Sequence, residues 1–214
     1  MVIYLHSFKP DSSRRHEHSW ENALIVLDYM ELGNPSDRHF EHRNQPLIQG
    51  VGTKYFTLLE GIPLPAVRID ILEKIELGYP SKVKKIVQIS YDDLTSMAKA
   101  NLSEALKMII IENEKFFTEF FNIADPVNIR LHTLELLPNI GKKTMRFILD
   151  ERAVRRFENF DDIRRRVGID PVKVLVERLL KEFMGGEKYY LFLKPTERDS
   201  IYLRYLERLY GEII

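Results

Sequence analysis

The hydrophobic pattern of this chain changes near residue 90, and this change limits the folds that it can adopt. Before residue 90, short apolar runs are separated by turn residues. Val67, Ile69 and Ile71 alternate with polar side chains, as in a strand with one face in water. The expected strands are residues 23–30, 47–51, 54–59, 67–71 and 83–89. About five short strands in some 70 residues predict a small closed barrel or sandwich.

After residue 90 the apolar residues recur at helical spacing. Residues 102–120 follow this spacing and predict one long helix with a buried face. Four helix starts are indicated by capping boxes or by a capping residue before proline: Ser90 with Asp93, Asn159 with Asp162, Asp125-Pro126 and Asp170-Pro171. Residues 189–193 predict a strand, and Thr196 with Asp199 predicts the start of a last helix.

The change of pattern also predicts the domain organisation of an α+β protein. We expect a mobile N-terminal extension over residues 1–19, a β-barrel over 20–90, a helical domain over 91–184, and a C-terminal strand and helix over 185–214. The last strand and helix are expected to return and brace the barrel. His16 and His18 could bind a metal, but a solvated terminus explains them better, so no metal site is expected.

The composition restricts the classes of function. The 214 residues include 32 basic and 32 acidic side chains, so attraction to a polyanion must come from a local patch. The absence of cysteine excludes disulfides, thiolate metal sites and cysteine nucleophiles. No secretory signal, membrane-spanning run, Walker loop or dinucleotide-binding glycine pattern is present. We therefore expect a cytoplasmic protein with no cofactor and no membrane segment.

The sequence LPNIGKKTMRFIL, residues 137–149, predicts a tight turn between two helices. A helix over residues 131–137 is expected to end at Pro138, and a second helix to begin near Lys142. Between them, Gly141 would give the backbone the freedom to reverse. Ile140 would anchor the turn in the core.

This turn predicts a phosphate-binding site. The free NH groups of Asn139, Gly141 and the first helical residues would face an anion at the positive end of the helix dipole. Lys142, Lys143 and Arg146 stand where they could close on the same phosphate or on its neighbour.

A related turn follows over residues 167–173, with Gly168 at the reversal and Lys173 in the next helix. From Lys142 to Lys173 there are ten basic and six acidic residues. Arg165, within a run of three arginines, is a candidate contact, although such a run is commonly a solvated helix face. Asp170 would repel a phosphate, which favours a mainly structural role for this second turn.

Residues 136–180 resemble the tandem helix-hairpin-helix motif, whose turns hold the sugar-phosphate backbone without reading bases. The usual hairpin is glycine, hydrophobic residue, glycine. Asn139 replaces the first glycine of the first hairpin, and Asp170 replaces the second glycine of the second hairpin. Asparagine tolerates a left-handed backbone, so the first departure is mild.

Residues 20–193 also resemble an archaeal family of unknown function, through segments such as VLDYM, KYFTLLE, ISYDDLTSMAKANL and KYYLF. The resemblance implies an OB-like β-barrel followed by an all-α tandem helix-hairpin-helix domain, and it implies RNA binding. Genes of this family tend to lie beside those for translation and ribosomal RNA modification. This favours RNA over DNA and suggests the ribosome or rRNA-processing factors as partners.

An OB-like barrel could stack bases on aromatic rings of its strand face. Tyr55 and Phe56 would point to opposite faces of one expected strand, so at most one of them is exposed. We expect this to be Tyr55, flanked by Lys54. Arg68 is a weaker candidate.

Two other functions remain open. The turn is similar to that of base-excision glycosylases, in which a lysine at the position of Lys143 forms a Schiff base and an aspartate at the spacing of Asp161 assists. The surroundings of Asp161 fit a capped helix start better. The chain could also be a protein-interaction adaptor that has lost nucleic-acid binding. The sequence favours non-catalytic binding of nucleic acid, RNA foremost.

Overall fold

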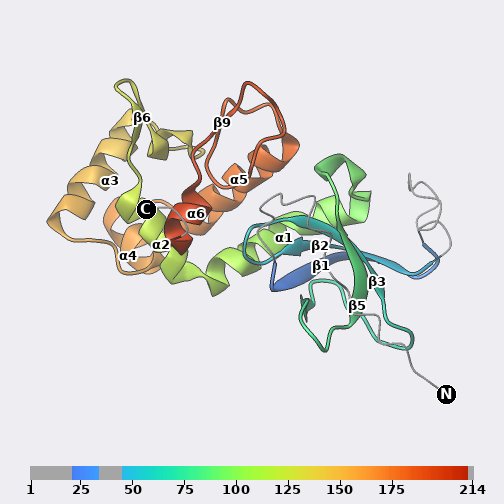
Figure 1. Ribbon diagram of the computed structural model, residues 1–214. Helices are drawn as coiled ribbons and strands as arrows, with labels where there is room; N and C mark the ends of the chain where they lie inside the picture. Colours follow the sequence, from blue (N-terminus) through green and yellow to red (C-terminus); the bar gives the residue numbers. More distant parts are fainter. Residues whose placement is uncertain (1–20, 34–44, 212–214) are drawn as a thin grey trace, which may run out of the picture.

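The computed structural model describes residues 21–33 and 45–211, so the predicted extension over residues 1–19 lies outside the described residues. The first part of the chain is a curled antiparallel sheet with the strand order β4-β1-β2-β3-β5 (Figure 1). The strands are β1 (Ala23–Met30), β2 (Leu47–Gly52), β3 (Leu58–Pro63), β4 (Lys74–Glu76) and β5 (Val83–Gln88). Shifts of register in β1 and β3 mark bulges, which bend strands and let the sheet curl. The predicted strand-rich first part is confirmed as a half-barrel.

The two central strands of this sheet are buried on both faces. Every residue of β2 and of β3 is buried. Leu24 and Val26 belong to a core inside the curl, whereas Ile25 and Leu27 pack on the opposite face in the cluster that includes α1 (Ser96–Glu112). The faces of β2 and β3 are therefore closed to a stacking base.

Two of the predicted strands differ from the structure. Residues 67–71 form no strand, because the chain turns on either side of them, with positive φ at Ala66 and Leu72. Residues 54–57 form a bend in which Phe56 has a φ of +59°, and β3 begins only at Leu58. The predictions for these two segments were wrong because an alternating pattern does not specify where a strand finds a partner.

The second part of the chain is mainly helical. After α1 the described residues contain α2 (Glu114–Ile123), α3 (Lys142–Val154), α4 (Phe160–Val167), α5 (Pro171–Met184) and α6 (Tyr205–Tyr210). The short elements are the 3-10 turns η2 (Tyr91–Asp93) and η3 (Thr133–Leu136), the hairpin of β6 (Pro126–Asn128) with β7 (Leu131–His132), and the parallel pair of β8 (Tyr189–Tyr190) with β9 (Ile201–Tyr202). Three of the predicted capping patterns are confirmed, at Ser90, Asn159 and Asp170.

Four predictions for this part were wrong. The long helix is broken at Asn113, whose amide donates to the Ile109 carbonyl at 2.8 Å. Asp125 precedes a strand and caps no helix, because its carboxylate accepts from the hydroxyl of Tyr205 at 2.5 Å and from Arg208. Residues 131–137 form β7 and a single 3-10 turn in place of a helix. The last helix begins at Tyr205, since the segment after Thr196 extends to pair as β9.

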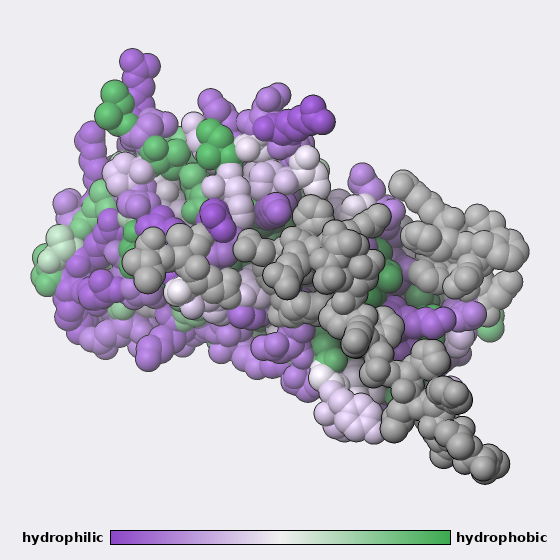
Figure 2. All heavy atoms as spheres, viewed as in Figure 1, coloured by the Kyte–Doolittle hydropathy of each residue, from purple (hydrophilic) through white to green (hydrophobic). Residues whose placement is uncertain are grey.

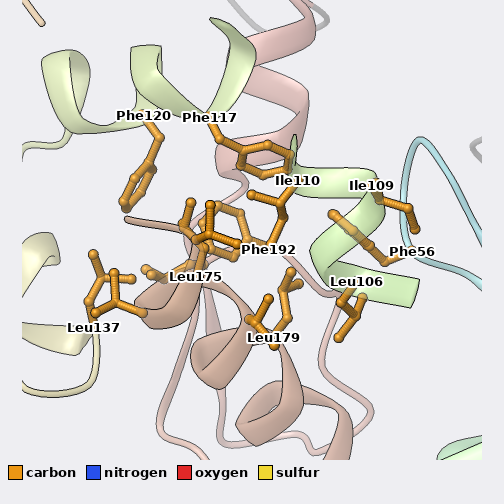
Figure 3. Close-up of a cluster of buried hydrophobic side chains, with 14 of the residues drawn as sticks. Phe56, Leu106, Ile109, Ile110, Phe117, Phe120, Leu137, Leu175, Leu179 and Phe192 are labelled. Atoms are coloured by element: carbon orange, nitrogen blue, oxygen red, sulfur yellow. The ribbon is translucent and has the colours of Figure 1, made fainter. Parts of the chain in front are cut away.

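A single hydrophobic cluster joins the sheet to the helices. Figure 3 shows Phe56 from the bend before β3 beside side chains of α1, with Phe117 and Phe120 of α2 and Leu175 and Leu179 of α5 farther along the same cluster. The chain end closes this cluster, because the hydroxyl of Tyr210 in α6 donates to the Lys54 carbonyl at 3.0 Å. The last helix thus contacts the first part of the chain, as expected, whereas β8 and β9 pair with each other and not with the sheet of β1 to β5.

The shared core predicts that both parts of the chain unfold together. Phe120 is fully buried and its ring packs against Phe192 and Tyr205 at centroid distances of 5.2 and 5.0 Å. Phe120→Ala should lower the free energy of unfolding by about 3 to 5 kcal/mol. Denaturant unfolding followed by far-UV circular dichroism and by aromatic absorbance should show one coincident transition. Val154→Ala, at an exposed position, should change stability by less than about 0.5 kcal/mol. Different transition midpoints for the two probes would contradict the shared core.

Candidate nucleic-acid interface

The predicted phosphate turn lies between η3 and α3 and is anchored from within. Ile140 is buried, as predicted, and its amide donates to the Leu137 carbonyl at 3.3 Å. Asn139 has a φ of +62°, so it is the residue with the left-handed backbone in this turn, as its tolerance of that conformation allows. Gly141 is extended, with φ −88° and ψ 179°. The predicted need for glycine freedom at Gly141 was therefore wrong.

The second turn repeats the first in its backbone plan. Asn139, Ile140 and Gly141 precede the start of α3, and Gly168, Ile169 and Asp170 precede the start of α5 in the same order. Gly168 is left-handed, with a φ of +79°, as Asn139 is in the first turn. The last residue of each trio is the N-cap of the following helix.

The two N-caps differ in whether they leave the first backbone amides of the helix available to an anion. Asp170 Oδ1 accepts from the amides of Val172 and Lys173 at 3.1 and 3.4 Å. Gly141 makes no side-chain cap, so the first amides of α3 remain available to another acceptor. At the start of α5, the Asp170 carboxylate occupies the position where an anion would bind. At the start of α3, the N-cap Gly141 has no side chain to occupy the equivalent position.

Three basic side chains at the first two turns of α3 face solvent. Lys142, Lys143 and Arg146 are exposed, and within the described residues none of them has an ion pair or a side-chain hydrogen bond. The other seven basic residues from Lys142 to Lys173 are engaged with carboxylates or backbone oxygens: Arg152, Arg155, Arg156, Arg164, Arg165, Arg166 and Lys173. Lys142, Lys143 and Arg146 therefore form a solvent-facing cationic group, whereas the other basic residues of this region are held by partners within the fold.

The arginine run in α4 belongs to this internal network. Arg165 is exposed but donates to Asp162 Oδ1 at 2.7 Å, and Arg166 donates to Asp162 Oδ2 at 3.0 Å. Burial works against the charge of Asp162, yet hydrogen bonds from Arg166, Arg165 and the Glu158 amide outweigh it and hold the pKa of this carboxyl below its ordinary value. Lys173 is the remaining candidate at the second turn, and its Nζ lies 4.0 Å from Glu177 Oε1.

A buried ion pair supports the first turn from α5. The turn borders an open hollow of about 540 Å³ whose lining includes Arg178, Lys181 and Glu187. Arg178 is buried and donates to Glu182 at 2.8 Å, to Glu187 at 2.8 Å and to the Leu136 carbonyl at 3.3 Å. Sequence reasoning missed this support, although the spacing of Arg178 and Glu182 by four residues on an apolar helix was a readable signal.

Acidic side chains limit the cationic surface on this side of the turn. Glu135 and Glu187 also line the hollow. The amide of Asn139 donates to Glu177 at 3.4 Å. The basic side chains of Lys142, Lys143 and Arg146 lie on the solvent side of α3, whereas Lys181 lines the hollow together with these carboxylates.

The predicted barrel contacts lie in a different setting. Lys54 and Tyr55 are in the bend between β2 and β3, where the Glu21 carboxylate accepts from both amides at 2.8 and 3.0 Å. The ring of Tyr55 meets Tyr210 edge-on at 5.5 Å, and the ammonium of Lys54 lies over both rings. The premise that Tyr55 and Phe56 share a strand was wrong.

The geometry expected of a lysine nucleophile is not assembled around Lys143. Lys143 is exposed, and Asp161 is exposed in the first turn of α4, where it accepts from Arg164 at 2.7 Å. Among the residues that the structure describes, no hydrogen bond links Lys143 to Asp161. Residues 21–33 and 45–211 hold no cluster of three metal-ligating side chains, and their helices are too short or too polar to cross a membrane. His16 and His18 lie outside the described residues.

Residues 20–194 match the family model described as a protein of unknown function, DUF655. The chain belongs to this family. It is 39% identical over 181 residues to the uncharacterized protein MJ0038 of Methanocaldococcus jannaschii, covering 82% of this chain and 81% of that protein. It is 40% identical to Af1531 of Archaeoglobus fulgidus, whose crystal structure it matches with a TM-score of 0.73 over 81% of this chain and all of the other. The family relationship expected from the sequence is thus confirmed, with archaeal relatives.

The Asp162 network predicts an acid-sensitive element in the helical part. A carboxyl whose pKa is depressed in the folded state contributes stability above its unfolded pKa, and this contribution is lost as the pH falls through the folded pKa. Asp162→Asn should lower the free energy of unfolding at neutral pH by about 3 kcal/mol, because three arginines lose a buried partner. Urea unfolding between about pH 5 and pH 2 should show a shallower loss of stability in the variant than in the wild type. Asp161→Asn, at an exposed position, is the control; equal acid slopes for all three proteins would contradict the role of Asp162.

Proposed function

We propose that this protein binds nucleic acid without catalysis, with RNA as the natural class, and that it holds the backbone phosphates at the start of α3. The observation that carries this proposal is the trio Lys142, Lys143 and Arg146, which is exposed and unengaged among the described residues, while the other basic residues from Lys142 to Lys173 are engaged. The uncapped amides after Gly141 add donors at the same place. Cations and backbone amides together are what a phosphate requires.

We interpret the two turns as a reduced tandem helix-hairpin-helix unit. The shared order of a left-handed residue, an isoleucine and an N-cap supports this interpretation. The first unit is reduced because η3 replaces its leading helix. The curled sheet, by the same proposal, is an OB-like barrel. Its buried central strands suggest that the barrel contributes a rigid support or a protein contact more than a stacking surface.

Only the first turn is proposed to hold phosphate. Asp170 already accepts from the amides at the start of α5, and Arg164 donates to Asp170 at 3.3 Å. The second turn would then position the first through the packing of α4 and α5. The preference for RNA rests on the family resemblance and on no contact within the chain.

The phosphate proposal predicts a steep dependence of binding on salt. Lys142→Ala/Lys143→Ala/Arg146→Ala should weaken binding of single-stranded RNA and DNA of any sequence and should lower the slope of log K against log salt by about 2. Fluorescence anisotropy at two or more salt concentrations measures both quantities. The matched control is Lys84→Ala/Lys107→Ala/Lys115→Ala, which removes three exposed lysines from other elements and should leave the slope unchanged. If no nucleic acid binds at low salt, the adaptor function replaces this proposal.

A lyase activity would leave a covalent mark on Lys143. Borohydride reduction in the presence of abasic DNA should give no adduct, because Lys143 is exposed and no hydrogen bond among the described residues links it to Asp161. Gel electrophoresis of labelled DNA detects such an adduct. An adduct that disappears in Lys143→Ala but persists in Lys142→Ala would overturn the non-catalytic function.

A further inference from the structure

We propose that the outer face of α3 takes an unpaired stretch of nucleic acid, with its phosphates on Lys142, Lys143 and Arg146 and one base stacked on Phe147. This inference rests on the proposed function and adds to it a preference for single strands. It concerns the face of α3 that points away from the core.

Phe147 is set apart from the other phenylalanines that the structure describes. Its side chain is 45% exposed, whereas the rings of Phe117, Phe120 and Phe192 are buried and pack against one another. Within residues 21–33 and 45–211, Phe147 has no ring pair and no cation–π contact. Its neighbour Ile148 is buried, so α3 turns its apolar residues both toward the core and toward solvent.

The spacing places this ring beside the cations. Phe147 follows Lys143 by four residues and Arg146 by one, and side chains four apart on a helix are neighbours, with about 5 to 6 Å between Cβ atoms. A backbone that crosses the first turns of α3 would therefore meet cations and then an aromatic face. Figure 2 shows hydrophobic atoms among hydrophilic ones on the surface of the helical part, at the left of the view.

An exposed carboxylate marks the end of this surface. Asp150 is exposed and follows Phe147 by three residues, so it lies about one turn farther along α3. A second phosphate carried past the ring would meet this negative charge. The surface therefore fits a short contact with a single base, flanked by phosphates on the cationic side.

The pairing of a ring with cations favours an unpaired nucleotide over a duplex. A base inside a duplex has both faces covered by its neighbours, whereas an unpaired base can stack on an aromatic side chain in a sequence-tolerant way. Lysine and arginine side chains complement the phosphate charge on either form. Phe147 would thus discriminate single strands from duplexes, whereas the cations would attract both forms.

Tryptophan at position 147 gives a direct reporter of stacking. In a Trp20→Phe background, Phe147→Trp carries a single tryptophan, and Val154→Trp, also exposed on α3, is the matched control. A ten-nucleotide single-stranded RNA should quench the fluorescence at position 147 and leave that at position 154 nearly unchanged. The same sequence as a blunt duplex should quench neither.

Affinity supplies a second measurement. Phe147→Ala and Phe147→Leu should both weaken binding of the single strand by about tenfold, because both remove the aromatic face, and should change duplex binding by less than about twofold. Phe147→Leu keeps an apolar side chain, so an equal loss in both variants supports stacking. Circular dichroism checks that each variant is folded.

The outcomes separate this inference from the proposed function. The stacking site is refuted and the phosphate site stands under one combination of results. In it, the wild type binds and the Lys142, Lys143 and Arg146 substitutions weaken binding, but Phe147→Ala and Phe147→Leu bind both forms as the wild type does and the fluorescence of Phe147→Trp is not quenched. If the wild type binds neither form at low salt, the proposed function itself fails. If a poly-glutamate peptide binds with the same dependence on Phe147 as the RNA, the surface fits an acidic protein partner and the inference is overturned.

Discussion

The buried pair of Arg178 and Glu182 is the interaction on which the arrangement of the helical part depends. Glu182 accepts from Arg178 and from three consecutive amides, those of Leu191, Phe192 and Leu193, at 2.6 to 3.0 Å. Burial raises the pKa of the Glu182 carboxyl, while Arg178 and the amide donors favour its charged form. Arg178 also donates to the carbonyls of Leu136 and Tyr189. One helix thus fixes both the turn before α3 and the chain segment that closes the core.

This support explains how a neutral chain can present a local cationic site. Most basic residues near α3 and α4 pair with carboxylates within the fold. The single carboxylate of Asp162 accepts from three of them, Arg155, Arg165 and Arg166. These internal pairs hold most of the basic side chains of this region within the fold. The three cations of α3 then stand out because their neighbours are neutralised, and not because the region is strongly basic.

The sequence predicted the elements that local chemistry determines. The change of period at residue 90, the helix start at Asp170 and the anchoring role of Ile140 follow from patterns within a few residues. The wrong predictions concern residues whose conformation depends on a partner distant in sequence. The Asp125 carboxylate, for example, accepts hydrogen bonds from Tyr205 and Arg208, some 80 residues away. Likewise Tyr55 meets Tyr210 of the last helix, a contact that no local pattern indicates. For the candidate site, the sequence identified the cations but not which of them the fold would neutralise.

The difference between the two N-caps offers the most direct test of the phosphate site. Gly141 has a backbone conformation open to any residue, and a Cβ there would have no described atom within 4 Å, so Gly141→Asp should fold and cap α3 as Asp170 caps α5. The measurement is the affinity of Gly141→Asp and of Gly141→Asn for a single-stranded RNA, with thermal stability measured in parallel. We predict that Gly141→Asp keeps or gains stability and loses at least about tenfold in affinity, more than the uncharged Gly141→Asn, because the new carboxylate occupies the anion position. An affinity of Gly141→Asp equal to that of the wild type would contradict a phosphate site at the start of α3.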